Sequence, residues 1–207
     1  GENTTLLKYN SFGNALWGST IFSASNNGSG AGSAFNAISV DILGYIYVAG
    51  YQLPNDSINY GGSGVVINTG TNMLGFVLSY GSNGIARWSK IPTINGTSTG
   101  HELYGIQSDI NGNIYVSGYQ GGSATYDYGN GVNFTLATNI GYPIILKLSS
   151  TGFPQWIKSI HSGDGGGFRG ITLDQNNSII LAGSKGRNVF YENNLQVISL
   201  TGSDSVI

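Results

Sequence analysis

Apolar and small polar residues alternate in short runs of about five to seven residues along the whole chain. A period of two places every second side chain on one face, which is the pattern of a half-buried β-strand. The runs are rich in β-branched and aromatic residues, and turns containing Asn and Gly join them in pairs, which indicates β-hairpins. No run shows the periodicity of an amphipathic helix, so the pattern predicts an all-β protein.

Two kinds of hairpin alternate along the chain at fixed spacings. The first kind has a glycine followed four residues later by a tryptophan, at Gly13 and Trp17, Gly84 and Trp88, and Gly152 and Trp156. The second kind has an aspartate followed nine residues later by a glycine, at Asp41 and Gly50, Asp109 and Gly118, and Asp174 and Gly183. Three copies at such constant spacings indicate a tandem structural repeat.

The residues of this repeat form two motifs, K-x-x-x-x-G-x-x-x-W and I-x-x-D-x-x-G-N-I-Y-V-x-G. The best copy extends over residues 101–158, whereas Ser79 replaces the Lys in one copy and Asn176, Asn177 and Ser178 replace the Gly-Asn turn in another. The pattern resembles the bacterial β-propeller repeat family (the SBBP repeat) over nearly the whole chain. The resemblance implies four-stranded antiparallel blades, with the Asp hairpin inside and the Trp hairpin outside, and it implies little about function.

On this layout we expect a single β-propeller repeat domain over residues 1–207, with three sequence repeats. It would contain an outer hairpin at 5–21, blades at about 34–90 and 101–160, and an inner hairpin at 168–184 with part of an insert to 207. The repeat is longer than common propeller repeats, and the surplus lies in two inserts rich in Gly, Asn and Tyr, at 51–73 and 119–141.

Three blades cannot close a ring, because the smallest propellers have roughly four. Three resolutions stay open at this point. Two chains could form a six-bladed ring as a homodimer by exchanging hairpins, or the chain could be a fragment of a longer propeller. Alternatively, the unpaired ends could join subunits into a fibre, since open strand edges template further pairing.

The composition favours an extracellular protein or one on the surface of a cell or virion. Charged residues make up only 9% of the chain, against about 25% in ordinary soluble proteins, and glycine accounts for 34 of 207 residues. The net charge of −2 argues against nucleic-acid binding, and no apolar stretch approaches the roughly 20 residues of a membrane span. Six Asn-x-Ser/Thr sequons are candidate glycosylation sites: Asn3, Asn27, Asn55, Asn95, Asn133 and Asn176.

Most repeated polar and aromatic residues have a structural interpretation. Asp41, Asp109 and Asp174 could form a carboxylate ring or a metal site, but Asx-type turns explain them better. The three tryptophans could stack on sugars, but packing between adjacent sheets explains their repetition better. Cysteine is absent, which excludes cysteine-ligated zinc, and we expect no catalytic residue, metal or cofactor.

The candidate ligand-binding residues lie in the inserts and in the connections between blades. Tyrosine offers a rigid apolar face with a polar tip, and His101 and His161 could meet Glu102, Asp164 and Arg169 near one rim. The candidate tyrosines are Tyr51, Tyr60, Tyr119, Tyr126 and Tyr128.

These residues predict a non-catalytic surface scaffold that binds a protein or carbohydrate partner through its loop face. The alternative is a structural subunit of a surface layer, virion or appendage that self-associates through open blade edges. An enzyme is the third hypothesis, and it would need acidic residues gathered in a central channel.

Overall fold

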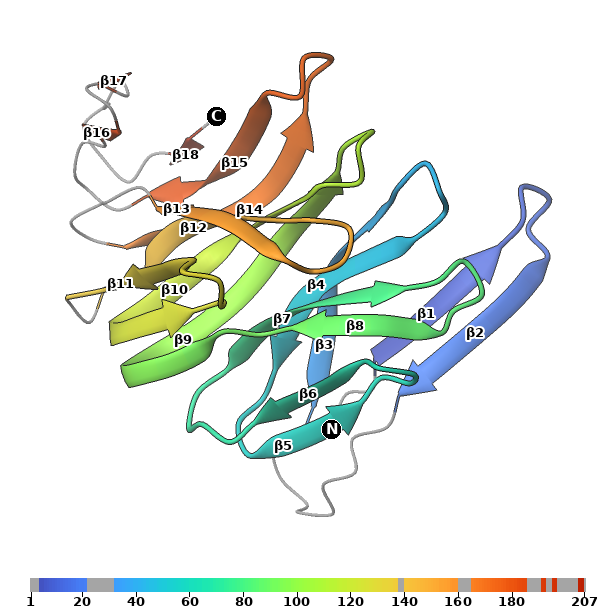
Figure 1. The fold of residues 1–207 in the computed structure, drawn as a ribbon, viewed down its shortest axis with the longest axis horizontal. Helices are drawn as coiled ribbons and strands as arrows, with labels where there is room; N and C mark the ends of the chain where they lie inside the picture. Colours follow the sequence, from blue (N-terminus) through green and yellow to red (C-terminus); the bar gives the residue numbers. More distant parts are fainter. Residues whose placement is uncertain are drawn as a thin grey trace.

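The computed structural model describes residues 4–21, 32–137, 140–159 and 165–185, and three short strands beyond them. Within these residues every regular element is a strand and every strand pair is antiparallel, which confirms the prediction of an all-β protein (Figure 1). In the same part of the chain there is no helix with the length and apolar character needed to span a membrane.

The first half of the chain forms a hairpin, a four-stranded sheet and a second, smaller hairpin. The first hairpin consists of β1 (Thr4–Tyr9) and β2 (Ala15–Ile21). The four-stranded sheet has the order β3 (Ser33–Val40), β4 (Ile46–Gln52), β7 (Leu74–Tyr80) and β8 (Ala86–Lys90). The smaller hairpin, β5 (Asp56–Asn59) and β6 (Val65–Asn68), lies within the first insert.

The second half repeats this plan with longer strands. Four strands follow one another in a sheet: β9 (Thr93–Ser108), β10 (Ile114–Asp127), β12 (Tyr142–Leu148) and β13 (Pro154–Ser159). Here the second insert extends β10, whose far end pairs with β11 (Asn133–Thr135). The last described sheet contains β14 (Gly166–Leu173), β15 (Ile179–Lys185) and β18 (Ser205–Val206), and β16 (Tyr191–Glu192) pairs with β17 (Leu195–Gln196).

The strand registers repeat from sheet to sheet. In each sheet the glycine that ends the second-strand motif pairs with the third strand: Gly50 with Phe76, Gly118 with Ile144, and Gly183 with Val206. The short strand β18 therefore takes the position of third strand beside β15, as β7 does beside β4 and β12 beside β10.

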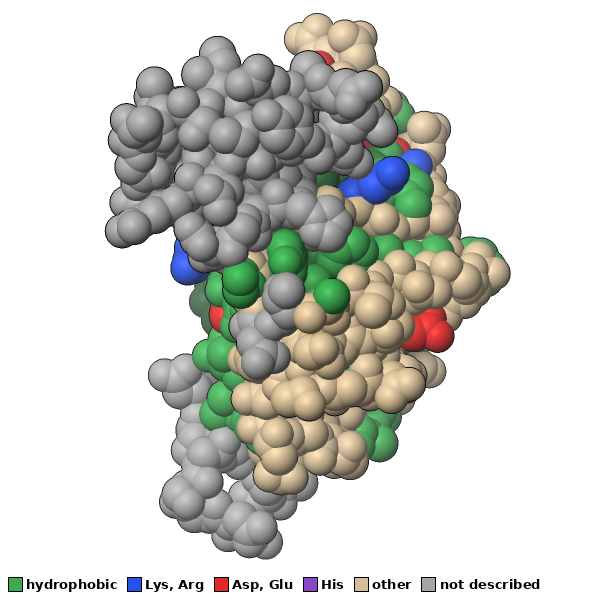
Figure 2. All heavy atoms as spheres, turned by 90° about the vertical axis from the view of Figure 1, so that its left-hand side faces the viewer, with side chains coloured by type: hydrophobic (Ala, Val, Ile, Leu, Met, Phe, Trp, Pro, Cys, Tyr) green, Lys and Arg blue, Asp and Glu red, His purple; other side chains and the backbone are tan. Residues whose placement is uncertain are grey.

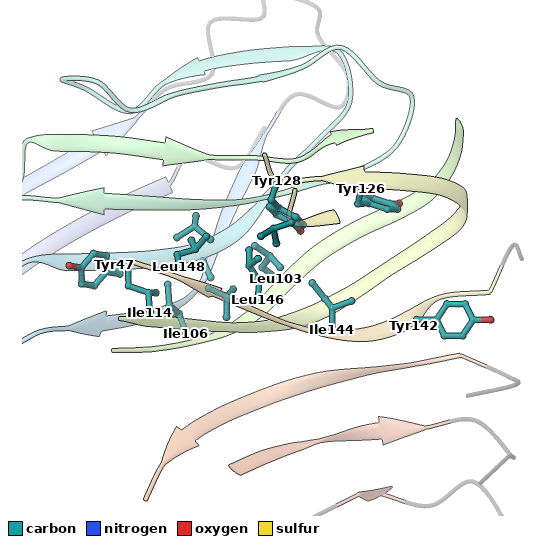
Figure 3. Close-up of a cluster of buried hydrophobic side chains, with 14 of the residues drawn as sticks. Tyr47, Leu103, Ile106, Ile114, Tyr126, Tyr128, Tyr142, Ile144, Leu146 and Leu148 are labelled. Atoms are coloured by element: carbon teal, nitrogen blue, oxygen red, sulfur yellow. The ribbon is translucent and has the colours of Figure 1, made fainter. Parts of the chain in front are cut away.

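The sheets lie beside one another in chain order, with their first strands β3, β9 and β14 as neighbours (Figure 1). One apolar cluster fills the space between the two larger sheets, the four-stranded one and the five-stranded one that includes β11. Tyr47 and Val77 of the earlier sheet meet Leu103, Ile114 and other residues of the later one there (Figure 3). A second cluster packs Leu6 of the first hairpin against Phe76 and Leu78. The first hairpin and the two larger sheets are thus stabilised mainly by burying apolar side chains against one another.

The six main hairpins share one turn geometry. In the turn after β3, the Asp41 N–H donates to the Tyr45 carbonyl and the Gly44 N–H donates back to the Asp41 carbonyl, and the other five turns repeat both bonds. The fourth turn residue has positive φ, which favours glycine, and the third copy uses Asn177 at a φ of 60° instead. The departure from the Gly-Asn turn therefore keeps the turn geometry.

The repeated aspartates support these turns, which confirms the Asx-turn interpretation. Each carboxylate oxygen Oδ1 accepts backbone N–H bonds from residues two and four positions later, at 2.7–2.9 Å. Asp41 and Asp109 also accept a hydroxyl bond, from Tyr47 and Tyr115 respectively. The remaining capacity of these carboxylates for a metal is correspondingly small.

Two of the tryptophans join successive sheets, as the packing interpretation expects. Trp17 Nε1 donates to the Ser82 carbonyl at 3.0 Å, and Trp88 Nε1 donates to the Ser150 carbonyl at 3.1 Å. Each ring lies against the turn glycine of the next sheet, so a Cβ on Gly84 or Gly152 would stand 2.9 Å from a ring atom. Both rings are partly exposed, and the side that lies against the next turn is a packing contact between sheets rather than an open platform for sugars.

Candidate functional site

The insert tyrosines are mostly buried, which does not agree with a surface-binding role for them. Tyr60 packs against Phe35 and Phe76, and Tyr126 and Tyr128 lie in the cluster between the two larger sheets (Figure 3). All three side chains are at most 2% exposed. The hairpins of the inserts fold back onto the sheets and use these rings as apolar anchors.

His101 is also fully buried, and its hydrogen bonds give it a structural role. The Gly75 N–H donates to Nδ1 at 3.2 Å, so Nε2 carries the proton and donates to the Tyr128 hydroxyl at 2.9 Å. Burial lowers the pKa of His101 to about 3, so the ring stays neutral near pH 7. It therefore does not face a ligand at the rim.

Three side chains occupy one position of the repeat, five residues before the turn aspartate: Asn36, Tyr104 and Arg169. At each of them the register with the second strand skips one residue, so each is the extra residue of a β-bulge. A bulge turns its side chain away from the regular alternation of the strand, and bulges are frequent beside functional sites. Because β3, β9 and β14 are neighbours, these three bulges form a row across the sheets.

Direct contacts connect this row. Asn36 Nδ2 donates to Glu102 Oε1 at 3.2 Å and to the Leu103 carbonyl at 2.8 Å. The Tyr104 hydroxyl donates to Glu102 Oε2 at 3.0 Å, and the Arg169 guanidinium lies 4.6 Å from the centre of the Tyr104 ring. Glu102 thus connects Asn36 with Tyr104, and Arg169, from the next sheet, stacks on the ring of Tyr104.

Tyr119 completes the cluster from the neighbouring strand β10. Its ring stacks on Tyr104, with 6.0 Å between the ring centres and 24° between the planes. Burial raises the pKa of Tyr104 and of Tyr119, and the nearby Glu102 carboxylate adds to the effect, so both phenols stay protonated at neutral pH. We call Asn36, Glu102, Tyr104, Tyr119 and Arg169 the bulge row.

The bulge row is a preorganised polar surface with one cation available for a partner. Asn36 and Arg169 are exposed and the other three side chains are partly exposed. Among the described residues Arg169 forms no ion pair, and its guanidinium is held in place by stacking. A guanidinium fixed in this way can donate paired hydrogen bonds to a carboxylate or sulfate group.

The structure brings together only some of the sequence candidates. Tyr119, Glu102 and Arg169 meet in the bulge row, Tyr51 is partly exposed elsewhere on β4, and His161 and Asp164 lie outside the described residues. Asn36 and Tyr104 are not among the residues predicted from the sequence, although their constant distance from the turn aspartate is a usable signal.

The sequons and possible metal ligands add little to this site. Asn55, Asn95, Asn133 and Asn176 are exposed, Asn3 and Asn27 lie outside the described residues, and glycosylation stays a prediction. In the described part of the chain, no three His, Asp or Glu side chains gather as a metal site would require.

Comparison with known protein families found none that matches this chain, and comparison with curated proteins found no significant match. The resemblance to the SBBP repeat therefore stays a prediction from the repeated residues, and the function proposed below rests on the geometry of the chain itself.

Proposed function

We propose that this chain is a β-propeller-type scaffold without catalytic activity that binds a partner through the bulge row. The propeller arrangement is supported by sheets that follow one another with equal registers and with neighbouring first strands. In such an arrangement the first strands face the central axis, and the bulge row would lie where ligands have access from the loop face.

The observation that carries the binding proposal is the exposed Arg169 guanidinium, stacked on Tyr104 and free of any described carboxylate partner. Holding a flexible side chain in place before binding reduces the entropy that association costs. An arginine that served only to stabilise the fold would be expected to pair with Glu102, which instead accepts from Asn36 and Tyr104.

The chemistry of the row favours a glycan that carries carboxylate or sulfate groups. The Arg169 guanidinium suits the acidic group, while the Asn36 amide and the tyrosine hydroxyls suit neighbouring sugar hydroxyls. Charged residues make up only 9% of the chain, and the face drawn in Figure 2 shows few of them. On a surface of this kind a guanidinium meets little competition from neighbouring charges for an acidic group. Acidic glycans are typical of the cell surface, which is one of the locations that the composition leads us to expect for this protein.

The test is binding of the protein to an array of neutral, carboxylated and sulfated glycans, followed by titration of the best ligand. Arg169→Ala should weaken binding at least tenfold, because a hydrogen bond to a charged group contributes about 1.5–3 kcal/mol. Arg87→Ala is the matched control, since Arg87 also stacks on a tyrosine, Tyr45, but lies outside the bulge row.

Selective loss of acidic-glycan binding in Arg169→Ala would support the proposal. Equal affinities of the Arg169→Ala and Arg87→Ala proteins would contradict it, as would binding only to neutral glycans. If no glycan binds but an acidic peptide does, the site is a protein-binding surface and the glycan assignment is wrong.

A further inference from the structure

The beginning of β9 has no counterpart in the neighbouring sheets. β9 has 16 residues, whereas the first strands of the sheets before and after it, β3 and β14, have 8 each. The additional residues, Thr93 to Ser98, pair with the part of β10 that continues beyond its pairing with β12. Among the described strands β9 pairs with β10 alone, so its other edge lies at the margin of the sheet (Figure 1).

The backbone groups of alternate residues in this segment face the open edge. The Ala124 carbonyl of β10 accepts the N–H of Leu136, which follows β11 on the side of β10 away from β9. Ala124 lies opposite Gly96, and opposite residues in an antiparallel ladder exchange either both hydrogen bonds or none. The N–H and C=O of Gly96 therefore point away from β10, as do those of Ile94 and Ser98, two positions to either side.

The neighbouring insert already pairs with the inner end of this edge. Asn72 Nδ2 donates to the Ser98 carbonyl at 2.8 Å, and the His101 N–H donates to the Met73 carbonyl at 3.1 Å. An amide donor followed by a carbonyl acceptor is also what an added strand would present there. Among the described residues none continues this pairing towards the start of β9.

A cleft of about 320 Å³ lies along the open edge, between the start of β9 and the loop from β6 to β7. Its apolar lining consists of Met73, Leu74 and Ile94, and none of its lining residues is charged. The buried Asn68 holds the loop in place, because its amide donates to three backbone carbonyls and accepts the Gly70 N–H. The cleft is therefore formed before anything binds, and it suits an apolar side chain.

The residues of this segment do not protect its edge. Natural sheets usually blunt an open edge with charged residues or proline, because unpaired backbone groups otherwise accept another strand. The segment from Thr93 to Thr99 begins directly after Pro92 and contains neither a charged residue nor a proline. The side chains of Thr93, Asn95, Gly96 and Thr97 are exposed, so another strand has access to it.

We propose that the start of β9 binds an extended, uncharged segment of a partner protein as an added strand. The N–H and C=O groups of that segment pair with those of Ile94 and Gly96, and one of its apolar side chains enters the cleft beside Met73. The backbone pairing supplies affinity and the cleft supplies selectivity, as in other cases of strand addition. The site shares no residue with the bulge row, and the inference does not depend on the function proposed there.

The first test selects partners for the intact 207-residue protein from a displayed library of random peptides. The protein is produced without N-glycosylation, so that the sequon at Asn95 carries no glycan beside the edge. We expect the enriched peptides to share a segment with alternating apolar residues and no charge. A library from which no such peptide is enriched would overturn the proposal.

Backbone pairing is tested by N-methylating the best peptide at alternate residues. Methyl groups on the N–H groups that face β9 should weaken binding at least tenfold, because each removes a hydrogen bond and obstructs the edge. Methyl groups on the intervening residues are the matched control, since those N–H groups face away from β9, and this peptide should keep its affinity. Equal affinities of the two methylated peptides would contradict strand addition. This comparison uses the wild-type protein, so it stays decisive if a variant fails to fold.

Three protein variants test the edge and the cleft. Ile94→Pro removes an N–H that faces the open edge and leaves the ladder with β10 intact, so it should weaken peptide binding at least tenfold with unchanged far-UV circular dichroism. Met73→Lys places a charge in the cleft and should also weaken binding. Ile67→Lys is its matched control, because Ile67 is 51% exposed in the same insert but does not line the cleft.

Two results with these variants would overturn the assignment. Equal peptide affinities of the Met73→Lys and Ile67→Lys proteins would show that the cleft does not receive a side chain. A wild-type dimer that Met73→Lys converts to a monomer would show that a second copy of the chain, rather than a partner protein, occupies the edge.

Discussion

At the scale of single residues, equivalent positions of the repeat carry different chemistry on the same backbone. The bulge position holds an amide, a phenol and a guanidinium at Asn36, Tyr104 and Arg169, whereas the turn position holds aspartate in all three copies. The turn needs a side-chain acceptor for two backbone N–H groups, which restricts the residue type. The bulge imposes no such demand, so its side chain is free to serve recognition.

His101 gives a prediction for stability as a function of pH. Its pKa is lowered to about 3 in the folded protein, below the value of about 6.5 in the unfolded chain. Its contribution is therefore fully present above about pH 6.5, and it is lost as the pH falls towards 3, because only the unfolded chain takes up the proton. The loss from this group should approach about 1.4 kcal/mol per pH unit.

The measurement is urea unfolding at about pH 7.5 and about pH 5, compared between wild type and two variants. His101→Gln should be less stable at the higher pH and should show a smaller decrease on acidification. His161→Gln, which alters the other histidine, should keep the wild-type decrease. If His101→Gln lost as much stability on acidification as wild type, the buried neutral state of His101 would be wrong.

At the scale of elements, the hairpins could be predicted from the sequence and the inserts could not. Alternation and turn residues fixed where the main strands begin and end, because both are local properties. The inserts have the Gly, Asn and Tyr content of exposed loops, yet β5–β6 and β10–β11 place Tyr60, Tyr126 and Tyr128 in the core. Whether a tyrosine anchors a hairpin or faces solvent depends on long-range packing, which composition does not reveal. The bulges were missed because register is a relation between strands.

The insert hairpins yield a prediction that compares Tyr51 and Tyr60, both of which the sequence offers as candidate ligand-binding residues. Tyr60→Ala should reduce the free energy of unfolding by about 3–5 kcal/mol, since it empties a fully buried aromatic site between Phe35 and Phe76. Tyr51→Ala, at a partly exposed position, should cost less than about 1.5 kcal/mol. Denaturant titration of both variants measures the difference, and similar losses for the two would show that the hairpin does not anchor the sheet.

At the scale of the whole molecule, successive sheets touch through an inner contact between first strands and an outer contact between a tryptophan and a turn. The inner contact buries large apolar areas, and the outer contact adds a hydrogen bond and a close approach that only glycine permits. Both contacts join sheets that are consecutive along the chain. The free energy of unfolding should therefore be a sum of contributions from single sheets and from contacts between neighbouring sheets, as in repeat proteins. A change at one junction should then affect mainly the two sheets that meet there.

Alanine substitutions at three turn glycines distinguish the contribution of the tryptophan contact to stability from that of the turn itself. Gly13, Gly84 and Gly152 have φ of 79–81° in equal turns, so alanine at each should cost about 1–2 kcal/mol from backbone strain. At Gly84 and Gly152 the new Cβ also stands 2.9 Å from a tryptophan ring, and overpacking should add about 1–3 kcal/mol. Unfolding is measured by denaturant titration, and Gly13→Ala should be the mildest of the three, because no described heavy atom lies within 4 Å of its new Cβ. Equal losses for all three alanine variants would show that the tryptophan contacts do not hold the sheets together.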